Sequence, residues 1–194
     1  MKRLVGASLA VGDRNEVRLA GAGSHGVIEA GLILQEAAAI YDDLNAHHVQ
    51  SYGPEARSDV ARSEVIISDG DIDYPKATQI DLFLTTTQEA LERYLSDVKP
   101  GGLVIADEDV DTDGASGFRV LRLPLIATAE HELQKPSLLH VVALGALVEA
   151  SNVVSKPAIE AAVKDHVPKG GEELHMKALL AGYRLAHRGA AQDE

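Results

Sequence analysis

The stretch "LAGAGSHGVIEAG", residues 19–31, decides the fold, because it places a glycine-rich turn between an alternating segment and a helical one. Residues 16–21 alternate as a strand does, and apolar residues recur at helical spacing over 26–44. Three glycines between them fit the pattern G-x-G-x-x-G, namely Gly21, Gly23 and Gly26. The stretch therefore predicts the first strand–turn–helix unit of an α/β protein.

The rest of the chain continues this alternation and then becomes helical. Further strands are predicted over 47–53, 63–69, 80–87, 103–109 and 118–125. Helices are predicted over 88–98, 128–135, 137–151, 156–167 and 171–189. Strands that alternate with helices favour a parallel sheet with helices on both faces. We expect one domain over 1–194, a three-layer, mainly parallel Rossmann-like sheet, with 127–189 mostly helical.

The composition excludes several classes of protein. A chain of 194 residues with 45% apolar residues can bury roughly 70% of its unfolded surface, so it needs no disulfide or metal ion to stabilise the fold. It contains no cysteine, which excludes disulfides, thiol nucleophiles and thiolate-ligated iron–sulfur clusters within this chain. Any such redox centre must lie on a partner.

The charge and the apolar runs limit the partners. Thirty acidic residues against 18 basic ones give a net charge of −12, and no basic stripe interrupts them, so we expect no nucleic-acid binding. The N-terminal apolar run in "MKRLVGASLAVGD" is short and interrupted by glycine, which disfavours a signal peptide. No stretch approaches the roughly 20 apolar residues of a spanning helix, so we expect a cytoplasmic protein without membrane contact.

The glycine turn has three interpretations. It could bind the pyrophosphate of a dinucleotide, but such a site needs an acidic residue roughly 20 residues further on, and Glu55 lies well beyond that spacing. The glycines could instead only let strand and helix pack closely, or shape the turn for a partner's site. The candidate residues for a phosphate or interface loop are Gly21, Gly23, Ser24, His25 and Gly26.

Other polar residues favour structural roles. His25 could contact phosphate or titrate near neutrality, but a loop histidine more often caps a turn. His140 and His175 lie on apolar helix faces, which favours packing over metal ligation. The acidic run "DEDVDTDG", residues 107–114, lacks the glutamate that closes a calcium loop, so it is predicted to be a solvated turn. We expect no catalytic residue and no metal site on this chain.

An ordered set of segments carries a family resemblance. Together with the glycine turn it comprises "SYGPEARSDVARSEVIISDGDIDYP" (51–75), "QEALERYLSDVKPGGLVIADED" (88–109), "VVALGALVEASNVVS" (141–155) and "ALLAGY" (178–183). From Glu16 to about Tyr183 the chain resembles the gamma subunit of 2-oxoacid:ferredoxin oxidoreductases. It departs from that pattern where Ser24 and His25 replace a Gly-Gln pair, and where His140 replaces a frequent asparagine.

The resemblance implies a subunit of a larger enzyme. That family oxidatively decarboxylates a 2-oxoacid with coenzyme A, giving acyl-CoA, CO2 and electrons for ferredoxin or a similar acceptor. It implies thiamine diphosphate and Mg2+ between alpha and beta subunits, and 4Fe-4S clusters on beta or on a ferredoxin-like delta subunit. This chain would bind none of these cofactors alone, and CoA would be a co-substrate of the complex.

The segment 51–57 supplies the candidate interface residues near that active site. Arg57 on a proline-stiffened turn can bind a carboxylate or a phosphate with two parallel hydrogen bonds. Tyr52, Gly53, Pro54 and Glu55 would fix the turn. A surface salt bridge and a direct ligand contact are the alternative roles for Arg57.

Two other functions remain open at this point. The chain could be a stand-alone nucleotide- or CoA-binding Rossmann-like module. It could also be an independent NAD-dependent enzyme, although no ribose-binding acid and no evident catalytic pair of histidine and acid support that. An obligate subunit should associate or aggregate when it is alone, whereas a binding module should be monodisperse and gain stability with its ligand.

Overall fold

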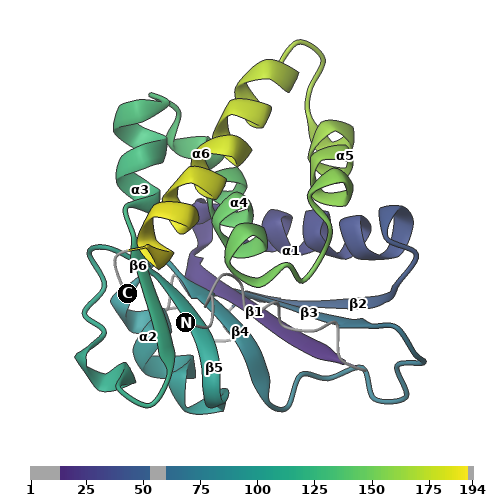
Figure 1. Ribbon diagram of the computed structural model, residues 1–194, viewed down its shortest axis with the longest axis vertical. Coiled ribbons are helices and arrows are strands. Elements are labelled where there is room, and N and C mark those ends of the chain that lie inside the picture. The colour runs from purple at the N-terminus through teal and green to yellow at the C-terminus, as the bar shows by residue number, and fades with distance from the viewer. Residues whose placement is uncertain (1–13, 53–59, 192–194) are drawn as a thin grey trace, which may run out of the picture.

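The protein folds around a six-stranded sheet in the order β2-β3-β1-β4-β5-β6 (Figure 1). The computed structural model describes residues 14–52 and 60–191. The strands are β1 (Asn15–Ala22), β2 (Asn45–Tyr52), β3 (Val60–Ser68), β4 (Ile80–Thr85), β5 (Val98–Asp107) and β6 (Arg119–Leu123). Only β3 runs against its neighbours β1 and β2, while β1, β4, β5 and β6 are parallel. The predicted mainly parallel sheet is confirmed.

Five of the six described helices overlap predicted segments, whereas the short third one precedes the segment 128–135 that was predicted to be helical. The helices are α1 (Val27–Glu36), α2 (Gln88–Tyr94), α3 (Leu125–Ala127), α4 (Leu139–Ser151), α5 (Lys156–His166) and α6 (Glu172–Ala190). The first and third continue into wider π turns over Ala37–Tyr41 and Thr128–Glu132. The first predicted helix therefore ends earlier than its apolar spacing suggested, and its last turn is not α-helical.

The segment 99–102 differs from its prediction. Its sequence "KPGG" was expected to separate the helix 88–98 from a strand at 103. Instead β5 already begins at Val98, which pairs with Ile80 before the register shifts. Gly101 at φ 76° absorbs this irregularity, because glycine adopts positive φ without steric cost.

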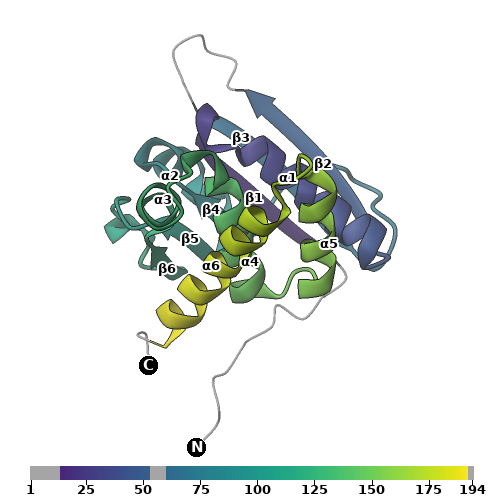
Figure 2. The same cartoon turned by 90° about the horizontal axis from the view of Figure 1, so that it is seen from above.

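One face of the sheet is covered by α1, α4, α5 and α6 (Figure 2). The helix α4 has buried residues on all its sides, which explains its nearly uniform apolar sequence. It crosses α6 at two glycines: a Cβ on Gly145 would lie 2.2 Å from the Leu179 carbonyl oxygen, and one on Gly182 would lie 2.1 Å from that of Val142. The two backbones approach this closely only because neither residue has a side chain.

The other face is covered only in part. There α2 packs over β1 and β4, and with Phe118 it buries an apolar cluster that includes Phe83, Leu91 and Val104. No described helix lies over β2 and β3 on this face. The prediction of helices on both faces is confirmed, although the second face has a single helix over one half.

The carboxyl ends of the parallel strands lie along one edge of the sheet. This edge carries the glycine turn at the end of β1, the Thr85–Thr87 segment at the end of β4, and Asp107 at the end of β5. Ala22 pairs with Val60, so β3 starts at the same edge, and β2 ends there at Tyr52. Ligand sites of open α/β sheets form at such edges, so the candidate site is sought here.

Candidate functional site

The glycine turn packs tightly against its neighbours. After Ala22 the chain makes a short 3-10 turn over Gly23–His25 and reaches Gly26 at φ 71°, a left-handed conformation that glycine adopts most easily. A Cβ on Gly26 would lie 3.0 Å from three atoms of His140. Both the backbone angle and this contact therefore require a glycine at the start of α1.

Gly21 contacts Thr86, which follows the last residue of the adjacent strand β4. A Cβ there would lie 2.0 Å from the Thr86 hydroxyl oxygen, and the Thr86 amide donates to the Ala20 carbonyl at 3.2 Å. Two of the three motif glycines thus have a packing reason. Gly23 and Ser24 form the exposed tip of the turn and remain accessible to a partner or a ligand.

His25 connects the turn to β4. Its Nδ1 lies 2.7 Å from the hydroxyl oxygen of Thr86, a buried side chain. Burial lowers the pKa of His25, and the carboxylates of Asp107 and Glu130 oppose that shift only in part. The imidazole is therefore favoured in its neutral form, in which the two ring nitrogens provide one donor and one acceptor. The sequence analysis did not identify Thr86 as a site residue. The only feature that marked it was the run of three threonines at the end of β4.

Asp107 corrects one prediction. The acidic run 107–114 was expected to be a solvated turn, but the side chain of Asp107 is almost fully buried. One carboxylate oxygen accepts from the Ile126 amide at 2.9 Å and the other from the Asp109 amide at 3.2 Å. Asp107 thereby ties β5 to the start of α3, because two amide donors compensate the burial of its carboxylate.

His140 has the packing role that its apolar helix face predicted. It is buried beneath Gly26, and its Nε2 lies 3.6 Å from a carboxylate oxygen of Glu29. Burial lowers the pKa of His140, while Glu29 and a hydrogen bond to the Ser137 backbone oppose the shift. A neutral imidazole therefore supports the turn from below.

Of the predicted interface residues, only Tyr52 lies among the described residues. Tyr52 is the last residue of β2 and pairs with Ala61. Gly53, Pro54, Glu55 and Arg57 lie outside the described residues. The two strands that flank them meet the glycine turn, since Val60 pairs with Ala22.

Two general properties concern the described part of the chain only. Residues 14–52 and 60–191 contain no group of three or more histidine or acidic side chains arranged to hold a metal ion. Within the same ranges, no helix combines the length and the apolar character that crossing a bilayer requires.

The fold and this edge define a class of protein: a Rossmann-like α/β chain whose glycine turn is packed on Thr86 and His140. Residues 16–185 match the family described as pyruvate ferredoxin/flavodoxin oxidoreductase, and the chain belongs to this family. The family resemblance carried by the sequence motifs is confirmed.

Relatives of known name are similar over almost their whole length. The 2-oxoglutarate synthase subunit KorC of Methanocaldococcus jannaschii is 44% identical over 176 residues, which cover 89% of this chain and 94% of that protein. The KorC protein of Methanothermobacter thermautotrophicus is 42% identical over 184 residues, covering 91% and 97%.

Solved structures agree with this assignment. The gamma subunit of a keto/oxoacid ferredoxin oxidoreductase from Geobacter sulfurreducens PCA has a TM-score of 0.83 and 42% identity, covering 91% of this chain and 98% of that one. A 2-oxoglutarate:ferredoxin oxidoreductase from Magnetococcus marinus has a TM-score of 0.82 at 24% identity. This chain covers only 31% of that longer chain, and the likeness shows the fold alone.

Proposed function

We propose that the chain is the gamma subunit of a 2-oxoacid:ferredoxin oxidoreductase complex whose substrate is 2-oxoglutarate. The observation that carries the proposal is the nearly full-length similarity to 2-oxoglutarate synthase subunits at 42–44% identity, together with the fold of a gamma subunit. The complex would convert 2-oxoglutarate and CoA to succinyl-CoA and CO2, release one proton to solvent and pass two electrons to ferredoxin.

The cofactors would belong to other subunits. Thiamine diphosphate supplies the carbanion chemistry of such a reaction, and iron–sulfur clusters carry the electrons. Because the chain has no cysteine, thiolate ligands for clusters must come from alpha, beta or delta subunits. We place thiamine diphosphate, Mg2+ and 4Fe-4S clusters on those partners.

The carboxyl edge of the sheet would face the partners near the active site. The glycine turn presents Gly23 and Ser24 at its exposed tip, beside the half-buried His25. Tyr52 and Val60 flank the segment that holds Gly53, Pro54, Glu55 and Arg57, and Val60 pairs with Ala22 just before the turn. This placement supports a shared surface, in which Arg57 binds a carboxylate or a phosphate at the interface.

The experiment is co-expression of the full chain with the alpha and beta subunits of its native host. We expect a stable complex that contains thiamine diphosphate and iron and reduces ferredoxin with 2-oxoglutarate and CoA, faster than with pyruvate. A lone, thiamine-free protein that binds NAD or CoA would contradict the proposal and favour a stand-alone module.

The interface role of Arg57 has its own test in the same complex. Arg57→Gln should lower the catalytic rate or the retention of the subunit at least tenfold. Arg119→Gln is the matched control, because Arg119 is exposed at the opposite end of the sheet. Equal behaviour of both variants would assign Arg57 to a surface salt bridge.

A further inference from the structure

One row of side chains on the second face changes character across the sheet. By strand register the row runs through Val120, Val104, Phe83, Arg18, Glu64 and Val49. It is apolar on β6, β5 and β4, and ionic on β1, beside the last residue of α2, and on β3, over which no described helix lies. A sheet face that carries ions where its cover ends indicates a surface with a different neighbour.

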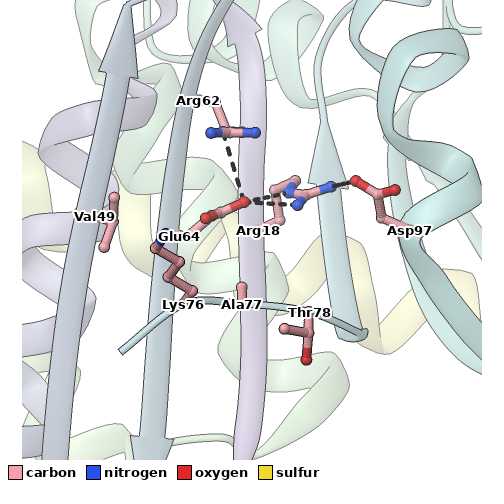
Figure 3. A pocket seen from close by; sticks show the side chains of 8 residues that line it. All are labelled: Arg18, Val49, Arg62, Glu64, Lys76, Ala77, Thr78 and Asp97. Atoms are coloured by element: carbon pink, nitrogen blue, oxygen red, sulfur yellow. Dashed lines mark hydrogen bonds and ion pairs between the residues drawn. The ribbon is translucent and has the colours of Figure 1, made fainter. Parts of the chain in front are cut away.

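Arg18 is the fully satisfied centre of the ionic half. Its side chain is only 4% exposed. Its guanidinium donates to Glu64 at 2.6 Å and to Asp97 at 2.5 Å (Figure 3). It also lies 5.0 Å from the centre of the Tyr94 ring. Two carboxylates and a ring face compensate its burial, so Arg18 has little capacity left for a ligand.

Arg62 is the second cation, and it is not satisfied in this way. Its Nε lies 3.6 Å from the same Glu64 oxygen, and its guanidinium lies 5.5 Å from the Tyr94 ring centre. Its side chain is 31% exposed, and within residues 14–52 and 60–191 its guanidinium makes no hydrogen bond. The donors on its two terminal nitrogens are therefore available.

These residues surround a hollow of roughly 510 Å3 on the open half of the face (Figure 3). Its lining residues are Arg18, Val49, Arg62, Glu64, Lys76, Ala77, Thr78 and Asp97. Three are cations and two are carboxylates, whereas the whole chain carries a net charge of −12. The hollow is a locally positive site on an acidic protein, which favours an anionic occupant.

We propose that this hollow is a docking site for an acidic side chain of a partner subunit, whose carboxylate is bound by the terminal nitrogens of Arg62. Lys76 adds positive charge at the rim, and Val49 and Ala77 provide apolar contact for the stem of the acidic side chain. The inference rests on the proposed function only in taking the partner from the alpha and beta subunits.

The chemistry of the hollow fits an interface anchor. A planar guanidinium over a tyrosine ring is pre-organised for two parallel hydrogen bonds to a carboxylate. Arginine and tyrosine are enriched among the residues that dominate binding energy, and enclosure by a partner strengthens such a pair. In the isolated chain the partly exposed Arg62, 3.6 Å from Glu64, contributes little to stability.

The test uses the complete complex, assembled from full-length subunits, and compares charge reversals. Arg62→Glu should weaken association of this chain with the alpha and beta subunits at least tenfold, and Lys76→Glu should weaken it less. Arg62→Lys keeps the charge but loses the two-pronged geometry, so it should have an intermediate effect. Arg119→Glu is the matched control, a reversal at an exposed site of the same sheet that should leave association unchanged. Native mass spectrometry and salt-dependent binding curves give the readout.

The outcomes separate this inference from the proposed function. If the unmodified chain does not assemble with these subunits, the proposed function fails, and the docking site with it. If it assembles and the Arg62 and Lys76 variants assemble equally well, only the docking site is wrong.

Loss of self-association in Arg62→Glu would assign the hollow to a second copy. Stabilisation of the isolated chain by succinate, abolished in Arg62→Glu, would assign it to a small anion. Both results would overturn the partner subunit as occupant.

Discussion

The two faces of the sheet differ in how they are closed. The first face lies beneath α1 and α4, and all of its strands contribute to one large apolar cluster. The second face has a smaller apolar cluster under α2 and, beside it, the ionic hollow around Arg18. The same strands β1 and β3 thus present Leu19 and Val65 to one side and Arg18 and Glu64 to the other.

This difference indicates that the first face serves the folding of the chain and the second face its assembly with partners. Apolar packing on the first face stabilises the subunit whether or not partners are present. An apolar surface of similar size on the open half of the second face would promote aggregation before partners bind. The exposed members of the ion network there, Arg62 and Asp97, can face water in the free chain and be enclosed in the complex, which is the behaviour we expect of a subunit surface.

The largest expected effect is at the crossing of α4 and α6 on the first face. Gly182→Ala would place a Cβ 2.1 Å from the Val142 carbonyl oxygen and 2.7 Å from the Ala146 amide nitrogen, so the backbones must separate. We expect a loss of about 3 kcal/mol in the free energy of unfolding, measured by urea denaturation. Gly117→Ala is the matched control, since a Cβ there meets nothing within 4 Å. Equal stabilities for the two variants would show that the first face is not tightly closed.

The second effect concerns the ionic half. Arg18→Leu leaves Glu64, which is 7% exposed, without its closest cation, and we expect a loss of about 3 kcal/mol in the free energy of unfolding. The double variant with Glu64→Leu should regain at least half of that loss, because the uncompensated charge is removed as well. If the double variant is instead as unstable as Arg18→Leu alone, the ion pair stabilises the fold by more than its burial costs.

The elements of the fold could be predicted because their patterns are local. The compact apolar run in 63–69 and the helical pattern over 137–151 need only neighbours in sequence, and both segments were found within three residues of their true bounds. The family resemblance was equally readable, because its motifs occur in order along the chain.

Contacts that depend on strand order could not be predicted in the same way. Arg18 and Glu64 are 46 residues apart and meet only because β3 pairs antiparallel with β1 in one register. The burial of Asp107 depends on its hydrogen bond with the amide of Ile126 in α3. The acidic residues that follow Asp107 in the sequence suggested an exposed turn instead. The contact of His25 with Thr86 likewise needs β1 and β4 to be adjacent.

The third effect is a pH dependence on the first face. Because burial lowers the pKa of His140, the folded chain binds its proton less readily than the unfolded chain, whose histidines titrate near pH 6.5. Stability is therefore complete above that pH and falls as the pH decreases through it. His140 faces Glu29, which opposes the shift, and His166 and His175, which add to it.

His140→Asn should reduce this acid sensitivity, since asparagine cannot take up the proton. The measurement is the thermal midpoint between pH 5 and pH 8 for both chains. His25 and His48 also have lowered pKa values from burial, so part of the dependence should remain. An unchanged pH profile would mean that protonated His140 is tolerated beneath Gly26, and that the first face is less closed there than its packing indicates.

The smallest expected effect is at Arg62, and it distinguishes the two cations of the ionic half most clearly. Arg62→Gln should change the free energy of unfolding of the isolated chain by less than about 0.5 kcal/mol, because the side chain is 31% exposed and its nearest carboxylate contact is 3.6 Å. Arg18→Leu, in the same hollow, should cost at least about six times as much on those estimates. If urea denaturation instead shows similar losses, both arginines serve the fold and the hollow has no cation to spare for a partner. If Arg62→Gln is neutral for the isolated chain and weakens the assembled complex, the geometry of Arg62 is maintained for a contact that only the complex provides.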